Sequence, residues 1–308
     1  MHFDIAKHTV FLARHGSHAY GTSLPTSDID TKGFAVSPKN FVLGFAYSFE
    51  QHQQMEPEDK VVYDIRKFCN LAADCNPNII EVLFVDDSDV LFQHPAGRLI
   101  RENRDLFLSK KARHTFSGYA VSQLKRIRTH RGYLLNPPDH KPTRKEYGLS
   151  TEMKITPDMM GAFDKMAAEG MAGDANVMDL VAREKRYKAA LDAWNSHERW
   201  KSERNQKRAV LEAEHGYDTK HGMHLVRLLR MCREILEGQG VIVRRPDAKE
   251  LLAIRAGEWP YEKLVEWAEQ QDAEMQTLYN ESTLRHAPDI AKLNDLCVQA
   301  QEMFWSTP

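Results

Sequence analysis

The pattern of apolar and polar residues changes along this chain of 308 residues. Near the amino end, short apolar runs at residues 10–13 and 60–64 predict buried strands. The alternation at residues 28–30 predicts another strand, with Ile29 facing the core. Two stretches with helical spacing of apolar residues follow within residues 65–84. Strands and helices in succession predict an α/β fold for this part of the chain.

The rest of the chain carries the longer period of helices. Residues 117–131 are predicted to be helical, and residues 218–236 are the clearest case because an apolar stripe follows one side. Residues 150–175 are rich in Met, Ala and Gly with weak periodicity, which is typical of a variable insertion. We therefore expect two domains, residues 1–112 with the sheet and residues 113–308 mostly helical.

A glycine-containing turn follows the first predicted strand. Gly16 permits a tight turn, in which backbone N–H groups and the Ser17 hydroxyl can hold a phosphate oxygen. In the next predicted strand, Asp28 and Asp30 share one face, where two carboxylates repel each other. A hard divalent cation relieves that repulsion, since Mg²⁺ prefers oxygen ligands and substrate phosphates. Each piece alone also occurs as an ordinary turn or cap, so it is the combination that favours a phosphate and metal site.

The combined motif resembles that of the polymerase-β-like nucleotidyltransferases. Their signature is Gly-Ser, a spacer, Asp-x-Asp and a third carboxylate on a later strand. Residues 16–33 have the string Gly-Ser-x-Ala-Tyr-Gly-Thr-x-x-Pro-x-Ser-Asp-Ile-Asp-x-Lys-Gly. It is similar to one branch, the nucleotidyltransferases linked to RNA repair that are described as a DNA polymerase beta family. Residues 63–68, 76–77, 220–228 and 254–258 are similar to the same branch.

The resemblance implies both a fold and a reaction. The fold would be a small polymerase-β-like nucleotidyltransferase sheet followed by a mostly helical part. The reaction would transfer a nucleoside monophosphate from an NTP to an acceptor hydroxyl and release pyrophosphate. Asp28 and Asp30 would hold two Mg²⁺ (or Mn²⁺) ions, and Gly16 and Ser17 would bind the triphosphate. Lys32 would help to neutralise the triphosphate.

Asp64 is the candidate for the third carboxylate. It ends the apolar run at residues 60–64, and the family pattern has a carboxylate on the corresponding strand. In this role Asp64 would join Asp28 and Asp30 as a catalytic metal ligand. The alternative is that Asp64 caps the helix that begins at Ile65, a position that Asp favours strongly. The sequence leaves both roles open.

Positive charge is concentrated in one segment. Residues 98–145 contain 13 Lys and Arg residues against 3 Asp and Glu residues, whereas the whole chain has a formal net charge of −2. Such a segment suits a polyanion such as RNA. A solvated helix surface accounts equally well for each single residue. The candidate RNA-binding residues are Lys125, Arg126, Arg128, Arg131 and Arg144.

A second basic group lies on the predicted helix at residues 218–236. Lys220, His224 and Arg227 occur at i, i+4 and i+7, so they share one face. They are candidates for nucleotide binding, with Arg227 as the strongest because a guanidinium can bind phosphate through two parallel hydrogen bonds. The alternative is an ordinary solvent-exposed face.

Composition limits where the protein acts. No apolar run approaches the roughly 20 residues of a membrane span, and residues 1–4 do not begin a signal peptide. The four cysteines show no CxxC spacing. We therefore expect reduced, buried thiols and a cytoplasmic protein without a membrane partner.

The acceptor of the reaction is the open question. The resemblance and the basic segment favour an RNA 3′ end, such as that of a tRNA, in RNA repair. A hydroxyl of a protein or a small molecule is the alternative acceptor. A catalytically silent RNA-binding module is the alternative class, against which the intact Asp-x-Asp argues. The sequence specifies neither the preferred NTP nor the oligomeric state.

Overall fold

The computed structural model describes residues 3–307, except residues 57, 153–154 and 170–174. The chain forms two compact units, one of Met1–Ile127 with Asp218–Pro308 and the other of Arg128–Tyr217. This division differs from the expected boundary between residues 112 and 113. The physical reason is that helices near the carboxyl end pack against helices that cover the sheet.

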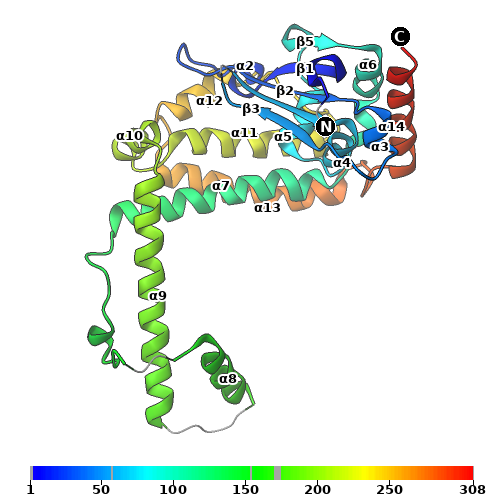
Figure 1. Ribbon diagram of the computed structural model, residues 1–308. Helices are drawn as coiled ribbons and strands as arrows, with labels where there is room; N and C mark the ends of the chain where they lie inside the picture. Colours follow the sequence, from blue (N-terminus) through cyan, green and yellow to red (C-terminus); the bar gives the residue numbers. More distant parts are fainter. Residues whose placement is uncertain (1–2, 57, 153–154, 170–174, 308) are drawn as a thin grey trace. The chain divides into compact units, whose positions relative to one another are not determined.

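The strands of the first unit, among the described residues, are β1 (Thr9–His15), β2 (Asp30–Ala35), β3 (Gln51–Gln54), β4 (Asp59–Asp64) and β5 (Val90–Gln93). They form one mixed sheet in the order β3-β4-β2-β1-β5 (Figure 1). β1 pairs antiparallel with β2 and β5, and β3 pairs antiparallel with β4. β2 and β4 are parallel. The sheet and its helices confirm the expected α/β class.

Two of the predicted strands are confirmed, since residues 10–13 lie in β1 and residues 60–64 in β4. The prediction for Ile29 is wrong, because its side chain is 41% exposed. The β1–β2 ladder starts at the pair His15–Asp30, so Ile29 precedes the strand. Asp30 is therefore the first residue of β2 rather than the last residue of a separate short strand.

Helices of the first unit surround the sheet. Their described members are α1 (Ile5–His8), α2 (Gly16–Tyr20), α3 (Lys39–Val42), α4 (Ile65–Ala73), α5 (Pro77–Leu83), η1 (Asp87–Asp89), α6 (Pro95–Glu102), η2 (Arg104–Phe107), the first part of α7 (Ala112–Leu135), α11 (Thr219–Leu236), α12 (Ala248–Arg255), α13 (Tyr261–Glu281) and α14 (Ile290–Trp305). The helices predicted within residues 65–84 and at residues 218–236 are confirmed as α4, α5 and α11.

Three long helices of the first unit lie side by side (Figure 1). α7 contacts α11 through Ser117 and Cys232, whose side-chain oxygen and sulfur are 3.7 Å apart. It contacts α13 through an ion pair of 3.0 Å between Arg113 and Asp272. α11 also packs on α12 and α13, and α14 packs on α4 and α6.

Aromatic residues fill the core between the sheet and α4. The ring centroids of Phe11 and Phe34 are 5.5 Å apart, and those of Phe34 and Phe68 are 4.4 Å apart. All three side chains are fully buried. Burial of aromatic side chains is a large source of folding free energy, so this cluster fixes β1, β2 and α4 relative to one another.

The second unit is helical. Its described elements are the end of α7, η3 (Arg144–Tyr147), α8 (Pro157–Ala168), α9 (Ala175–Glu203) and α10 (Gln206–His215). α8 shows that part of the predicted insertion is helical. Met153 and Met171 of that insertion lie outside the described residues.

The cysteines agree with the expectation from their spacing. Cys69, Cys75, Cys232 and Cys297 are all free and buried. Among the helices that the structure describes, none has both the length and the apolar character needed to cross a membrane.

Candidate functional site

The Gly-Ser turn lies directly against the carboxylate of Asp30. β1 ends at His15, and α2 starts at Gly16, whose φ of 67° favours glycine. A Cβ atom on Gly16 would lie 2.4 Å from Oδ2 of Asp30, closer than real atoms approach. Any other residue at position 16 would therefore displace the carboxylate or the turn. Ser17 follows in the first turn of α2 and is half-buried.

Asp30 lies against this turn, and the charges of Asp28 and Asp59 act on it; we term these three carboxylates the acidic cluster. Asp30 and Asp59 face each other across the parallel β2–β4 pair. Burial raises the pKa of Asp30, the charge of Asp59 raises it further, and Asp28 adds to the effect. Lys32 and Lys220 act in the opposite direction, so both cations lie close enough to influence the cluster.

Asp64 does not join the acidic cluster. It faces Ala35 across the sheet, five residues from Asp30 along β2 and therefore about 16 Å away. Its side chain is buried and accepts hydrogen bonds from the Ser37 hydroxyl at 2.5 Å and the Arg66 backbone N–H at 2.9 Å. Asp64 thus caps α4, which was the alternative interpretation, and the metal-ligand prediction for Asp64 is corrected.

Asp59 is the residue that the sequence analysis missed. The parallel pairing of β2 with β4 places the start of β4, not its end, next to Asp30. Oδ1 of Asp59 is buried and has no hydrogen-bond partner among the described residues. The only signal in the sequence was an acidic residue immediately before an apolar strand, and that position ends a polar segment that is typical of a loop.

Lys32 lies close enough to the acidic cluster for their charges to act on each other. Its side chain is half-buried, and its Nζ donates to the Asn78 carbonyl at 3.4 Å. Burial lowers the pKa of Lys32, while Glu81, Asp30 and Asp59 act to raise it. The ammonium group of Lys32 is therefore influenced both by the acidic cluster and by the buried carboxylate of Glu81.

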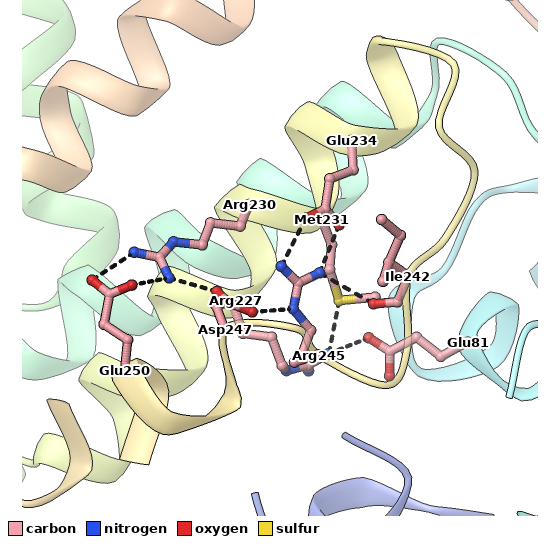
Figure 2. Close-up of polar contacts among 9 residues, drawn as sticks. All are labelled: Glu81, Arg227, Arg230, Met231, Glu234, Ile242, Arg245, Asp247 and Glu250. Carbon is pink, nitrogen blue, oxygen red and sulfur yellow. Dashed lines mark hydrogen bonds and ion pairs between the residues drawn. The ribbon is translucent and has the colours of Figure 1, made fainter. Parts of the chain in front are cut away.

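The three basic residues of α11 have different environments. Lys220 is exposed, and its charge acts on Asp30. Arg227 is buried and forms an ion pair of 2.5 Å with Glu81, as Figure 2 shows. His224 lies between them in sequence, with its Nδ1 atom 3.3 Å from Arg227. Of the three, Arg227 is the one whose guanidinium is paired in the protein interior and does not face solvent.

His224 is a neutral side chain at physiological pH. Burial, followed by the charge of Arg227, lowers the pKa of His224 to about 3. Arginine has hydrogen-bond donors only, so Nδ1 of His224 accepts from Arg227 and the ring proton is on Nε2. His224 can thus donate a hydrogen bond without carrying a charge.

A chain of ion pairs holds α11 against the segment that leads into α12 (Figure 2). Arg245 is buried and binds both carboxylate oxygens of Glu234, at 2.6 and 2.7 Å. It also donates to Asp247 at 2.8 Å, and Arg230 binds Asp247 and Glu250. Arg245 N–H donates to the Tyr20 carbonyl at 3.0 Å, which connects this network to the end of α2.

The candidate RNA-binding residues fall into two groups. Lys125, Arg126 and Arg128 are exposed on α7. Arg131 donates to the Gly216 carbonyl at 3.0 Å, and Arg144 binds both oxygens of buried Glu184 at 2.8 Å. Arg131 and Arg144 therefore have structural partners within the second unit. The first group is exposed, as contact with a polyanion requires.

The acidic cluster fits a divalent cation on two observations. Asp59 has an unsatisfied buried oxygen, and the missing side chain of Gly16 makes room for the carboxylate of Asp30 beside the turn. Over the described ranges, no three His, Cys, Asp or Glu side chains are already arranged to hold a metal ion.

A mixed sheet with a Gly-Ser turn against the second carboxylate of Asp-x-Asp is in keeping with the resemblance to a polymerase-β-like nucleotidyltransferase. Residues 3–141 match the model of a family described as RlaP, the RNA repair pathway DNA polymerase beta family. The match confirms the resemblance to the RNA-repair branch over this part of the chain, which includes α2 and the acidic cluster. No curated protein matches the chain.

Proposed function

We propose that this protein is a metal-dependent nucleotidyltransferase that adds a nucleoside monophosphate from an NTP to a hydroxyl of RNA, such as a tRNA 3′ end. The observation that carries the proposal is the contact between the Gly16 turn and Asp30, with Asp28 and Asp59 beside it. The reaction requires a turn that can bind phosphate and carboxylates that can bind metal, and the residues proposed for both roles lie within the segment that matches the RNA-repair family.

Different residues of the site would bind different parts of the NTP. The backbone N–H groups of the turn and the Ser17 hydroxyl would bind the outer phosphates of the NTP. Lys32 and Lys220 would neutralise part of its charge. In the reaction, the acceptor oxygen bonds to the α-phosphorus, the bond to the β-phosphate oxygen breaks, and pyrophosphate leaves. Catalysis of this kind depends mainly on position and on charge stabilisation.

Divalent cations would complete the site. Asp28, Asp30 and Asp59 are the residues that would hold Mg²⁺ or Mn²⁺. When bound, the cation supplies charge stabilisation to the phosphate oxygens and makes the acceptor hydroxyl more acidic. Without a cation, the acidic cluster would repel the triphosphate.

RNA is the acceptor that we propose on two grounds. The matching family is described by an RNA repair pathway, and α7 exposes Lys125, Arg126 and Arg128. The experiment is incubation of the purified protein with each labelled NTP and total RNA, with Mg²⁺ or with EDTA, followed by gel analysis. Mg²⁺-dependent label on RNA supports the proposal. Label on protein would identify a protein acceptor, and RNA binding without any transfer would identify a silent module.

Ser17→Ala is expected to weaken the use of NTP by about 1–3 kcal/mol, the range for a hydrogen bond to a charged group. The physical reason is the loss of the hydroxyl donor in the turn. Steady-state kinetics over a range of NTP concentration measures the effect. Ser23→Ala, a half-buried serine just after α2, is the control. Equal kinetics for both variants and the wild type would leave the turn with a structural role only.

Replacement of Lys125, Arg126 and Arg128 by Ala is expected to weaken RNA binding and to flatten its salt dependence. Each lost contact with a single strand reduces the slope by roughly 0.7, because fewer counterions are released. Filter binding over a salt series gives the slope, and calorimetry with NTP should show unchanged nucleotide binding. Replacement of three exposed lysines outside this segment, Lys7, Lys263 and Lys292, is the charge-matched control. An RNA affinity that does not respond to salt would contradict the RNA assignment.

A further inference from the structure

Glu81 is a fully buried carboxylate that has no part in the proposed chemistry. It lies on α5, binds two side chains from other elements and lies close to a third. Its Oε2 accepts a hydrogen bond of 2.5 Å from the Tyr20 hydroxyl, and its Oε1 accepts one of 2.5 Å from Arg227. Nε2 of His15 lies 3.4 Å from Oε2. We term these four residues the Glu81 cluster.

Two members of the Glu81 cluster flank the Gly-Ser turn. His15 immediately precedes Gly16, and Tyr20 is the last residue of α2. One carboxylate therefore contacts the chain on both sides of the turn that rests on Asp30. α2 has only five residues, and a helix this short is not stable by itself. Its position must come from contacts such as these.

Charge explains why the cluster is stable in the interior. Burial alone would raise the pKa of Glu81, but Arg227, with His15 and Tyr20, holds it well below its usual range. The guanidinium carbon of Arg227 also lies 3.8 Å from the centroid of the Tyr20 ring. Burial lowers the pKa of His15, so this ring is neutral. Glu81 and Arg227 thus form a buried pair of opposite charges that neutral partners surround.

We propose that Glu81 is a positioning residue for nucleotide binding: by accepting the hydrogen bond of Tyr20 on one side of the Gly16–Ser17 turn and contacting His15 on the other, it fixes the turn against Asp30 in the geometry that receives a phosphate. Arg227 serves the site through Glu81 and does not contact the nucleotide. The positioning of the turn follows from the geometry alone, and its effect on nucleotide rests on the proposed function.

The test compares Tyr20→Phe and Glu81→Asp with the wild-type protein. Tyr20→Phe removes one bond to the turn and keeps the Glu81–Arg227 pair, and Glu81→Asp shortens the carboxylate by one methylene. In both variants, amide hydrogen exchange of residues 17–22 is expected to accelerate about tenfold or more, and the affinity for NTP is expected to fall by a similar factor, the scale of a lost hydrogen bond to a charged group. Tyr63→Phe, which removes a half-buried hydroxyl on β4, should change neither quantity.

The two measurements separate the inference from the proposed function. Unchanged exchange at residues 17–22 overturns the inference, and so does acceleration that is equal in β2 and β4, because that indicates global destabilisation. Faster exchange with unaltered NTP affinity overturns the role in nucleotide binding. Faster exchange in a protein whose wild-type form binds no NTP supports the positioning of the turn and contradicts the proposed function.

Discussion

Asp30→Asn is expected to reduce nucleotide incorporation by at least about 10³-fold, which corresponds to roughly 4 kcal/mol in the activation barrier. Asp30 is the carboxylate that touches the Gly16 turn, and it is flanked by Asp28 and Asp59. Loss of its charge removes a ligand for the cation where phosphate and carboxylates meet. Single-turnover assays with labelled NTP, at saturating Mg²⁺, measure the effect.

The same substitution should not destabilise the protein in the absence of metal. The pKa of Asp30 is raised in the folded state, so folding becomes less favourable as the pH rises from its unfolded value through the folded value. Asn does not ionise, so the variant avoids the cost of a buried charge at this position. At pH 7 in EDTA, the melting temperature of the Asp30→Asn variant should equal or exceed that of the wild type. A large loss of stability would mean that Asp30 is structural.

Asp64→Asn is the control for the catalytic assignment. Asp64 caps α4 and binds Ser37 and Arg66. Asn keeps the capping oxygen, so this variant should lose only about 1 kcal/mol of stability, the scale of a lost ion pair at a partly exposed site. Its turnover per folded molecule should stay near that of the wild type, whereas Asp59→Asn should resemble Asp30→Asn. If Asp64→Asn lost turnover and Asp59→Asn did not, Asp64 would again be the candidate for the third metal ligand.

Arg227→Met is expected to lower the free energy of unfolding by about 3–5 kcal/mol, the cost of leaving a buried charge without its partner. Arg227 is 1% exposed and pairs with fully buried Glu81. Urea unfolding at pH 7 measures the loss. Arg230→Met is the matched control, since Arg230 belongs to the more accessible pairs of Figure 2 and should cost about 1 kcal/mol or less.

The pH dependence distinguishes this mechanism from simple loss of packing. In the wild type the pKa of Glu81 is lowered, so its contribution to stability is full above the unfolded value and is lost as the pH falls through the folded value. In Arg227→Met, burial should instead raise the pKa of Glu81, and protonation then relieves the penalty. The difference in the free energy of unfolding between the wild type and Arg227→Met should therefore become smaller from pH 7 to pH 4. A constant difference, or a loss equal to that of Arg230→Met, would contradict the buried-pair explanation.

Local patterns in the sequence predicted the elements well, and the motif predicted a turn at Gly16 followed by a nearby carboxylate. β1, β4, α4, α5 and α11 follow from apolar periodicity and from caps such as Asp64, which depend on neighbouring residues. The turn at Gly16 and its distance in sequence from Asp30 are also local features. These parts of the site can be predicted without knowing which strands pair with each other.

The remaining parts depend on contacts between distant segments. Asp59 reaches Asp30 only because β4 pairs parallel with β2, and the sequence contains no local signal for strand direction. Arg227 has the helical spacing of an exposed row, but its partner Glu81 lies 146 residues earlier. No periodicity in α11 could therefore distinguish a phosphate ligand from half of a buried ion pair.

The position of α14 has a consequence for the synthesis of the protein. This helix packs on α4 and α6, and the indole of Trp305 donates to the Ser37 carbonyl at 3.0 Å. The strands of the sheet are complete at residue 93, yet the helix that covers α4 is made only about 200 residues later, after about 10–40 s of translation. During that interval the apolar surface beneath α14 is exposed on the ribosome. Until α14 has emerged, the nascent chain would therefore expose an apolar surface of the kind that chaperones bind.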